Sequence, residues 1–80
     1  MQFASGESER KRLWGENVAA ARRTLGLSQP KLAAAAGCTQ QTISSIERGE
    51  YAPRDGLKVR LAEALRQDVR QLFPLTRSAA

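Results

Sequence analysis

Residues 25–49 read LGLSQPKLAAAAGCTQQTISSIERG, and this stretch decides the fold. Ser28 can begin a short helix by capping free backbone N–H groups, and Gly37 can end it in the left-handed conformation that other residues resist. Thr39 and Gly49 take the same two roles for a second helix. The stretch therefore predicts two short helices joined by a tight glycine turn. They cover 29–36 and about 40–48.

The second predicted helix has two different faces. At 100° per residue, Ile43 and Ile46 point inward together, with Glu47 beside them. The opposite face is small, polar and free of acidic residues, whereas a face meant only for solvent usually mixes Glu and Lys. Two such helices with a tight turn indicate a helix-turn-helix, which presents its second helix to the major groove of DNA. The outward residues are Gln40, Gln41, Ser44, Ser45 and Arg48.

Three more helices are predicted around this unit. The first carries an apolar stripe and ends at Gly26. Asp55 can cap a fourth helix after Pro53 breaks the chain, and Asp68 can cap a short fifth helix. No strand pattern competes, so we predict an all-α fold. The stripe consists of Trp14, Val18, Ala21 and Leu25, and the three helices cover about 13–24, 55–65 and 69–73.

Composition limits the classes of function. Eighty residues make one small domain, and a net charge of +5 favours an acidic partner, either nucleic acid or an anionic membrane. The membrane is disfavoured because no long apolar run and no amphipathic Lys-rich helix with bulky anchors is present. One cysteine and no histidine argue against a disulfide, a zinc site and His-based catalysis. We expect no enzyme, no metal, no cofactor and no small-molecule ligand.

The two ends of the chain differ in composition from the middle. Residues 1–12 are expected to form a flexible basic arm, and 76–80 a disordered polar tail, on either side of the domain at 13–75. The arm has no apolar stretch resembling a secretory signal. We therefore expect a cytoplasmic protein, associated with the nucleoid when it is bound to DNA.

Seven short motifs carry a family resemblance. They are LGLSQ at 25–29, LA at 32–33, AG at 36–37, IS at 43–44, IERG at 46–49, AEAL at 62–65 and LF at 72–73. Through them, the chain from Gly15 to Phe73 resembles the lambda-repressor/Cro superfamily, the XRE-type helix-turn-helix proteins. The resemblance implies a five-helix, lambda-repressor-like DNA-binding domain. The family includes phage repressors, Cro proteins, restriction–modification controllers and antitoxins.

The resemblance also implies roles in binding double-stranded DNA. Gln40 and Gln41 match the first base-reading positions, and we expect Gln40 to contact adenine, whose edge suits a glutamine amide. Ser44 and Ser45 match the next outward positions, although Ser45 stands where some lambdoid repressors have a glutamine. Gln29 matches a glutamine that bonds a DNA phosphate at a helix start. Further phosphate candidates are Lys31, Thr39, Arg48 and the arm residues Arg10, Lys11 and Arg12, and for the basic ones a solubilising charge is the alternative.

Other residues are expected to act structurally. Arg22 and Glu47 match a partly buried ion pair between the first and third helices of some family members, a structural role that would orient the DNA-reading helix. Cys38 fits a small core position better than a redox sensor. The chain departs from the family in Glu50, which would repel a nearby phosphate, and in Arg66, which replaces a common glycine.

A dimer is expected because a domain of this size makes few base contacts, and operator specificity normally needs two half-sites. The candidate dimer residues are Val59, Leu72, Phe73 and Leu75, although closure of the core is the better role for Leu72 and Phe73.

The sequence thus predicts a sequence-specific transcriptional regulator, a phage- or plasmid-type repressor that binds its operator as a homodimer through the major groove. The alternative is an antitoxin-type module whose main role is to bind a partner protein, with DNA autoregulation secondary. The chain lacks the long disordered neutralising tail that many antitoxins carry, which favours the repressor.

Overall fold

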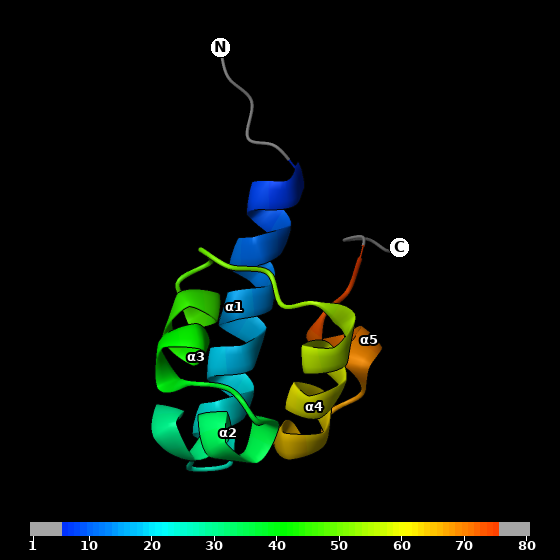
Figure 1. Cartoon of the computed structure of the whole chain (residues 1–80). Coiled ribbons are helices and arrows are strands. Elements are labelled where there is room, and N and C mark those ends of the chain that lie inside the picture. Colours follow the sequence, from blue (N-terminus) through cyan, green and yellow to red (C-terminus); the bar gives the residue numbers. More distant parts are fainter. Residues whose placement is uncertain (1–5, 76–80) are drawn as a thin grey trace.

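Five α-helices make up the fold in a computed structural model that describes residues 6–75 (Figure 1). The all-α, five-helix prediction is confirmed, and no strand occurs within the described range. None of the helices in residues 6–75 is long and apolar enough to cross a membrane. The helices are α1 (Gly6–Thr24), α2 (Gln29–Ala36), α3 (Gln40–Glu47), α4 (Asp55–Leu65) and α5 (Val69–Leu72).

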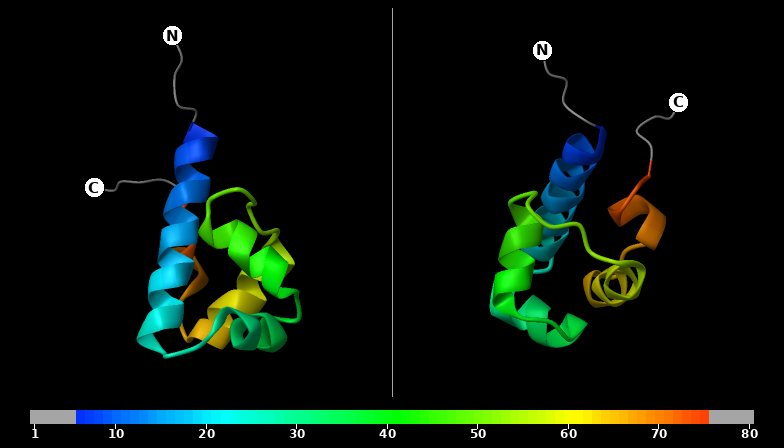
Figure 2. Two further views of the ribbon diagram at one scale, coloured as in Figure 1. Left: turned by 90° about the vertical axis from the view of Figure 1, so that its left-hand side faces the viewer. Right: turned by 45° about the horizontal axis from the view of Figure 1, so that its top comes forward.

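The helices pack around α1, which has α3 on one side and α4 with α5 on the other (Figure 2). The short α2 closes the lower end of the molecule against both α3 and α4. Apolar side chains from all five helices meet in one aliphatic core, as the stripes in the sequence predict. Its fully buried large members are Val18, Leu32, Ile43, Ile46, Leu61, Leu65 and Leu72.

The close approach of α1 to α3 depends on Gly15. A Cβ atom at this position would lie 2.2 Å from the backbone oxygen of Ile46 and 2.9 Å from that of Glu47. Contacts this short to backbone atoms can be relieved only if a helix moves. The absence of a side chain at Gly15 therefore sets how closely the second helix of the motif lies against the domain.

The turn between α2 and α3 is built as the sequence predicts. The Ser28 hydroxyl accepts a hydrogen bond from the backbone N–H of Lys31, and the Thr39 hydroxyl accepts one from Thr42. Gly37 ends α2 with φ = 73°, a left-handed conformation that places its N–H and that of Cys38 against α2 carbonyls. Cys38 is half-buried and packs against the core.

The first helix begins earlier than the sequence analysis predicted. Residues 6–12, expected in a flexible arm, are the first two turns of α1; residues 1–5 and the predicted tail at 76–80 lie outside the described residues. Glu7 and Glu9 in the first turn favour a helix start here, because acidic side chains suit its dipole. At the other end, Leu25 is 39% exposed and does not join the predicted stripe. The N–H of Leu25 still bonds the Ala21 carbonyl in the helical register, and the chain turns after it, at Gly26 with φ = 70°. Leu27, beyond the turn, packs against the core instead.

The start of α4 also differs from expectation. Asp55 is the first residue of the helix rather than its cap, and no side-chain cap bond forms there. The helix ends at Leu65, as predicted, and Arg66 follows it at φ = 60°, a left-handed conformation that residues other than glycine rarely adopt. Lys58 lies against the core, with its ammonium 4.1 Å from the centre of the Trp14 ring.

The carboxy-terminal segment is fastened to α1. The Trp14 indole N–H donates to the Pro74 carbonyl at 2.7 Å, and the Asn17 amide donates to the Leu72 carbonyl at 2.9 Å. The rings of Trp14 and Phe73 meet edge to face at 5.5 Å. Leu72 and Phe73 are 1% and 3% exposed, so they close the core of the protomer, the role that the sequence analysis favoured for both.

Candidate nucleic-acid interface

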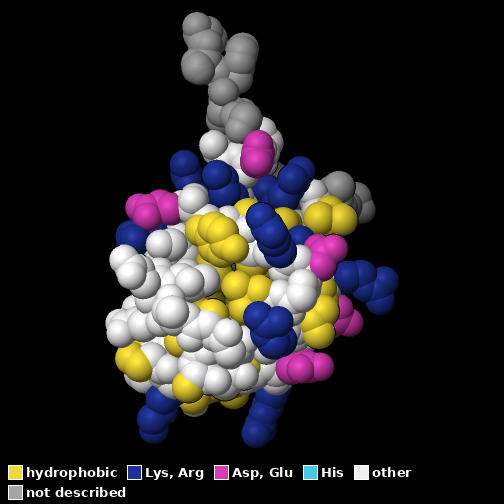
Figure 3. Space-filling view, in the orientation of Figure 1, with side chains coloured by type: hydrophobic (Ala, Val, Ile, Leu, Met, Phe, Trp, Pro, Cys, Tyr) yellow, Lys and Arg dark blue, Asp and Glu magenta, His cyan; other side chains and the backbone are white. Residues whose placement is uncertain are grey.

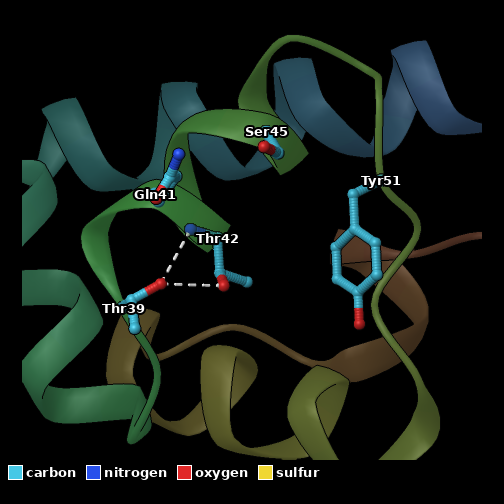
Figure 4. A pocket seen from close by; sticks show the side chains of 5 residues that line it. All are labelled: Thr39, Gln41, Thr42, Ser45 and Tyr51. Atoms are coloured by element: carbon cyan, nitrogen blue, oxygen red, sulfur yellow. Dashed lines mark hydrogen bonds between the residues drawn. The ribbon is translucent and has the colours of Figure 1, made fainter.

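The outward face of α3 forms a polar ridge between two hollows. One hollow of about 480 Å³ is lined by Thr39, Gln40, Gln41, Ser44 and Arg48. The other, of about 320 Å³, lies between α3 and the loop that follows it (Figure 4), and it is lined by Thr39, Gln41, Thr42, Ser45 and Tyr51. The structure therefore brings the four predicted base-reading residues onto one continuous surface, with Gln41 on the ridge between the hollows.

Thr42 and Tyr51 belong to this surface although sequence reasoning missed them. Tyr51 is 41% exposed, and its ring stands across the second hollow from Thr42 (Figure 4). The hydroxyl groups of Thr39 and Thr42 form a hydrogen bond, with 3.0 Å between their oxygens. Tyr51 follows α3 in a loop without regular structure, so no helical period could have placed it on this face.

A hydrogen-bonded chain links the core to the start of α3. Arg22 donates from Nε to Glu47 at 2.7 Å and from a terminal nitrogen at 3.1 Å, with a third bond to the Leu27 carbonyl. The Gln29 amide donates to the same carboxylate at 3.0 Å, and its oxygen accepts from Gln40 at 3.4 Å. The side chains of Arg22 and Glu47 are only 13% and 8% exposed. The first, second and third helices are thus tied together at the point where DNA reading is expected.

The ion pair shifts the pKa of both partners toward the charged forms. The hydrogen bond to Glu47 raises the pKa of Arg22. Burial acts to raise the pKa of Glu47, but hydrogen bonds from Arg22 and Gln29 and the charge of Arg22 outweigh it, so the pKa lies below its ordinary value of 4.5. Glu47 is therefore a carboxylate at neutral pH, and its paired charge holds α3 in place.

Gln29 and Thr39 already use part of their hydrogen-bonding capacity within the protein. One amide hydrogen of Gln29 bonds Glu47, which leaves a second for a DNA phosphate. The Thr39 hydroxyl already serves as the cap of α3 and contacts Thr42. Lys31 lies exposed in the first turn of α2.

The predicted basic cluster lies on α1 near the end of α3. The backbone of Arg12 lies close to Gly49, and Arg10 and Lys11 follow toward the start of the helix. Successive helical residues point about 100° apart, so the three side chains fan out and do not form a single patch. Figure 3 shows basic side chains gathered around the upper part of α1, above a mostly uncharged surface over α2 and α3.

Arg48 is held by its neighbours on the outer face. Its Nε and one terminal nitrogen bond the two carboxylate oxygens of Glu50 at 3.1 and 3.0 Å, and its other terminal nitrogen bonds the Ser44 hydroxyl at 2.6 Å. This hydrogen-bonded pairing raises the pKa of Arg48 and lowers the pKa of Glu50. The two side chains are 54% and 58% exposed, so they remain accessible to a ligand.

Comparison with known proteins agrees with this geometry. A family model described as helix-turn-helix matches residues 18–72, which is more than half of the chain. The chain belongs to this helix-turn-helix family. The match confirms the lambda-repressor/Cro-like, XRE-type resemblance found in the sequence motifs.

Individual relatives of this helix-turn-helix protein are described as HTH-type transcriptional regulators. It is 42% identical over 60 residues to an uncharacterized HTH-type transcriptional regulator of Methanothermobacter thermautotrophicus, covering 74% of this chain and 87% of the relative. A similar regulator of Sinorhizobium fredii, y4dJ, is 42% identical over 55 residues, covering 69% and 71% of the two chains. The crystal structure of the restriction-modification controller protein C.AhdI from Aeromonas hydrophila superimposes with a TM-score of 0.78 at 29% identity, over 82% of this chain and 96% of that one. The protein is a DNA-binding helix-turn-helix transcriptional regulator.

Proposed function

We propose that the protein is a sequence-specific transcriptional repressor that binds an operator as a homodimer, with α3 in the major groove. The observation that carries the proposal is the polar donor and acceptor face of α3, whose one cation, Arg48, is paired with Glu50. A partly buried ion pair directly behind the face holds it in place. Amide and hydroxyl groups can distinguish base edges, whereas a face that served only for attraction to DNA would be basic.

The positions of the side chains support the individual roles that we propose. Gln40 is exposed at the start of α3, and its amide is oriented by Gln29, so it is proposed to read adenine. Gln41, Ser44 and Ser45 read the adjacent bases. Contacts to phosphate come from Gln29 and Lys31 at the start of α2 and from the basic residues of α1, namely Arg10, Lys11 and Arg12.

The dimer is proposed to form around the exposed apolar residues of the carboxy-terminal half. Val59 is 46% and Leu75 67% exposed. Together with Val69 and the edge of Phe73 they line a shallow groove of about 250 Å³. Two copies joined here would present two α3 helices to half-sites about one helical turn apart. We propose that the DNA-bound regulator acts in the cytoplasm.

Selection from a randomised duplex library at physiological salt tests the function. An enriched inverted repeat with half-sites about 10 base pairs apart would support a dimeric operator-binding regulator. Recovery of no motif, with binding that disappears as salt rises, would contradict it, because such binding is driven by charge alone. In that case the antitoxin alternative would be tested by searching for a stable complex with a partner protein.

A second regulatory role is favoured by the structural neighbour C.AhdI, a restriction-modification controller protein. The same operator-binding chemistry would then control a pair of modification and restriction genes rather than phage or plasmid genes. Mapping the selected motif onto the genome that encodes this chain separates the two roles, since the operator would lie upstream of one gene class or the other.

A further inference from the structure

We propose that Arg48 reads a guanine base and that Glu50 is its positioning residue, in place of the phosphate contact that the sequence predicted for Arg48. The proposal rests on the DNA-binding function above and adds one base to the set that α3 reads. It is carried by three observations: the place of Arg48 on α3, the use of its hydrogen bonds, and the charge beside it.

The first observation is that Arg48 shares a hollow with base-reading candidates. Gln40, Gln41 and Ser44 line the same hollow, and Arg48 occupies its far end, at the carboxy-terminal end of α3. The recognition helix of a helix-turn-helix brings its amino-terminal residues closest to the base edges, so a residue at its carboxy-terminal end must reach further to contact a base. The long arginine side chain is suited to bridging the greater distance at the end of the helix.

The second observation concerns the five N–H groups of the guanidinium. The Glu50 carboxylate accepts hydrogen bonds from the Nε–H and from one N–H of a terminal nitrogen. The Ser44 hydroxyl accepts a hydrogen bond from one N–H of the other terminal nitrogen. One N–H therefore remains on each terminal nitrogen. Two donors held in one plane match the O6 and N7 acceptors of guanine, the commonest specific contact that arginine makes to DNA. Ser44 accepts from Arg48, so its own O–H is left as a donor toward the bases.

The third observation is that Glu50 cancels the charge on which a phosphate contact depends. Its carboxylate lies 3.0 Å from Arg48, so the pair carries no net charge, and a phosphate approaching Arg48 would also approach Glu50. Guanine is neutral and offers only acceptors at this edge, so Glu50 does not repel it. An exposed ion pair of this kind adds little to the free energy of unfolding. Its two hydrogen bonds instead hold the planar guanidinium of Arg48 in one orientation.

The salt dependence of binding separates the two roles of Arg48. On the selected operator, R48A is expected to lower affinity about ten- to a hundredfold, a far larger loss than on duplexes that lack one particular G·C pair, where only the unpaired charge of Glu50 weakens binding. Replacing that guanine by 7-deazaguanine, which lacks the N7 acceptor, weakens the wild type and leaves R48A unchanged. The slope of log affinity against log salt concentration stays the same in R48A, whereas K31A, the matched control for a phosphate contact, reduces it by about 0.9.

Glu50→Gln tests the positioning role. Loss of the negative charge favours binding to every duplex, but a less firmly held arginine discriminates less between guanine and adenine at its position. The preference for guanine is therefore expected to fall in E50Q while overall affinity does not. Both side chains are exposed, so R48A and E50Q are expected to unfold at the wild-type temperature, which excludes a folding defect as the cause.

Several results would overturn the proposal. If R48A weakened binding to all sequences equally and reduced the salt slope by about 0.9, Arg48 would be a phosphate contact. An unchanged guanine preference in E50Q would remove Glu50 as a positioning residue. If an operator is enriched but R48A discriminates at none of its G·C pairs, guanine reading by Arg48 is overturned while the proposed function stands. If no operator is recovered, the proposed function is overturned together with the guanine reading.

Discussion

Two arginine–glutamate pairs meet α3 at adjacent positions, and they differ in almost everything except their chemistry. Glu47 faces inward and pairs with Arg22 at 2.7 Å, with side chains 8% and 13% exposed. Arg48 faces outward and pairs with Glu50 at 3.0 Å, with side chains more than half exposed. One step of 100° along the helix separates a pair that holds the fold from a pair that is available to DNA. Burial, rather than the ionic contact itself, decides which role such a pair takes.

The largest effect is expected from Arg22→Ala. Removing the cation leaves the Glu47 carboxylate poorly solvated, so the free energy of unfolding should fall by about 3–5 kcal/mol. Urea denaturation measures this directly. Arg48→Ala is the matched control and should leave the free energy of unfolding almost unchanged, because its pair is exposed. Similar losses in the two variants would remove the distinction between the pairs.

Gly15→Ala is expected to displace α3, the helix that carries Glu47 of the inner ion pair and is followed by Arg48 of the outer one. The added methyl group would meet the backbone of Ile46 and Glu47, so α3 must move away from α1. We expect a loss of about 1–3 kcal/mol in thermal or urea unfolding, even though alanine favours a helix by about 1 kcal/mol over glycine. Gly6→Ala in the same helix has open space around it and serves as control, and it should not destabilise the protein. A stabilised Gly15→Ala protein would contradict the close crossing of α1 and α3.

The pH dependence of stability separates the two carboxylates. The folded-state pKa of Glu47 lies below the unfolded value, so its contribution is complete above that value and is lost as the pH falls through the folded-state pKa. Wild-type stability should therefore decrease as the pH drops below about 4.5, and Glu47→Gln should flatten this decrease while lowering stability at pH 7. Glu50 also has a lowered pKa, but Glu50→Gln should alter the profile less because the side chain is exposed. The account would be wrong if Glu50→Gln flattened the profile more than Glu47→Gln.

The smallest effect is expected at a site that neither pair touches. Arg66 ends α4 in a left-handed conformation, so Arg66→Gly should relieve backbone strain and stabilise the protein by about 0.5–1 kcal/mol in thermal unfolding. DNA affinity should stay the same apart from the loss of one positive charge. A lower unfolding temperature for Arg66→Gly would mean that contacts of the arginine outweigh the strain.

Local chemistry is what the sequence analysis could predict. The caps at Ser28 and Thr39 and the left-handed Gly37 depend on residues within a few positions of each other, and all three form as expected. The pairing of Arg22 with Glu47 was implied by the family resemblance, and the structure contains it.

Features that depend on tertiary placement were out of reach of the sequence. No apolar stripe marks the first two turns of α1, where only Glu7 and Glu9 favour a helix. Leu25 is 39% exposed although it directly follows α1, because the chain turns at Gly26 and Leu27 reaches the core. Tyr51 and Glu50 lie in a loop, where no period predicts which way a side chain faces. The pairing of Glu50 with Arg48 follows only once the loop is seen to turn back on the end of α3.

The central claim is that the outer face of α3 reads DNA sequence, and one titration tests it most directly. Wild-type protein and the Gln40→Ala/Gln41→Ala variant are titrated against the selected operator and a scrambled duplex at physiological salt. The account predicts that the wild type prefers the operator by about a thousandfold or more, and that the variant loses most of this preference but keeps its affinity for the scrambled duplex. A variant with the wild-type preference would contradict the account, because sequence would then be read elsewhere on the molecule.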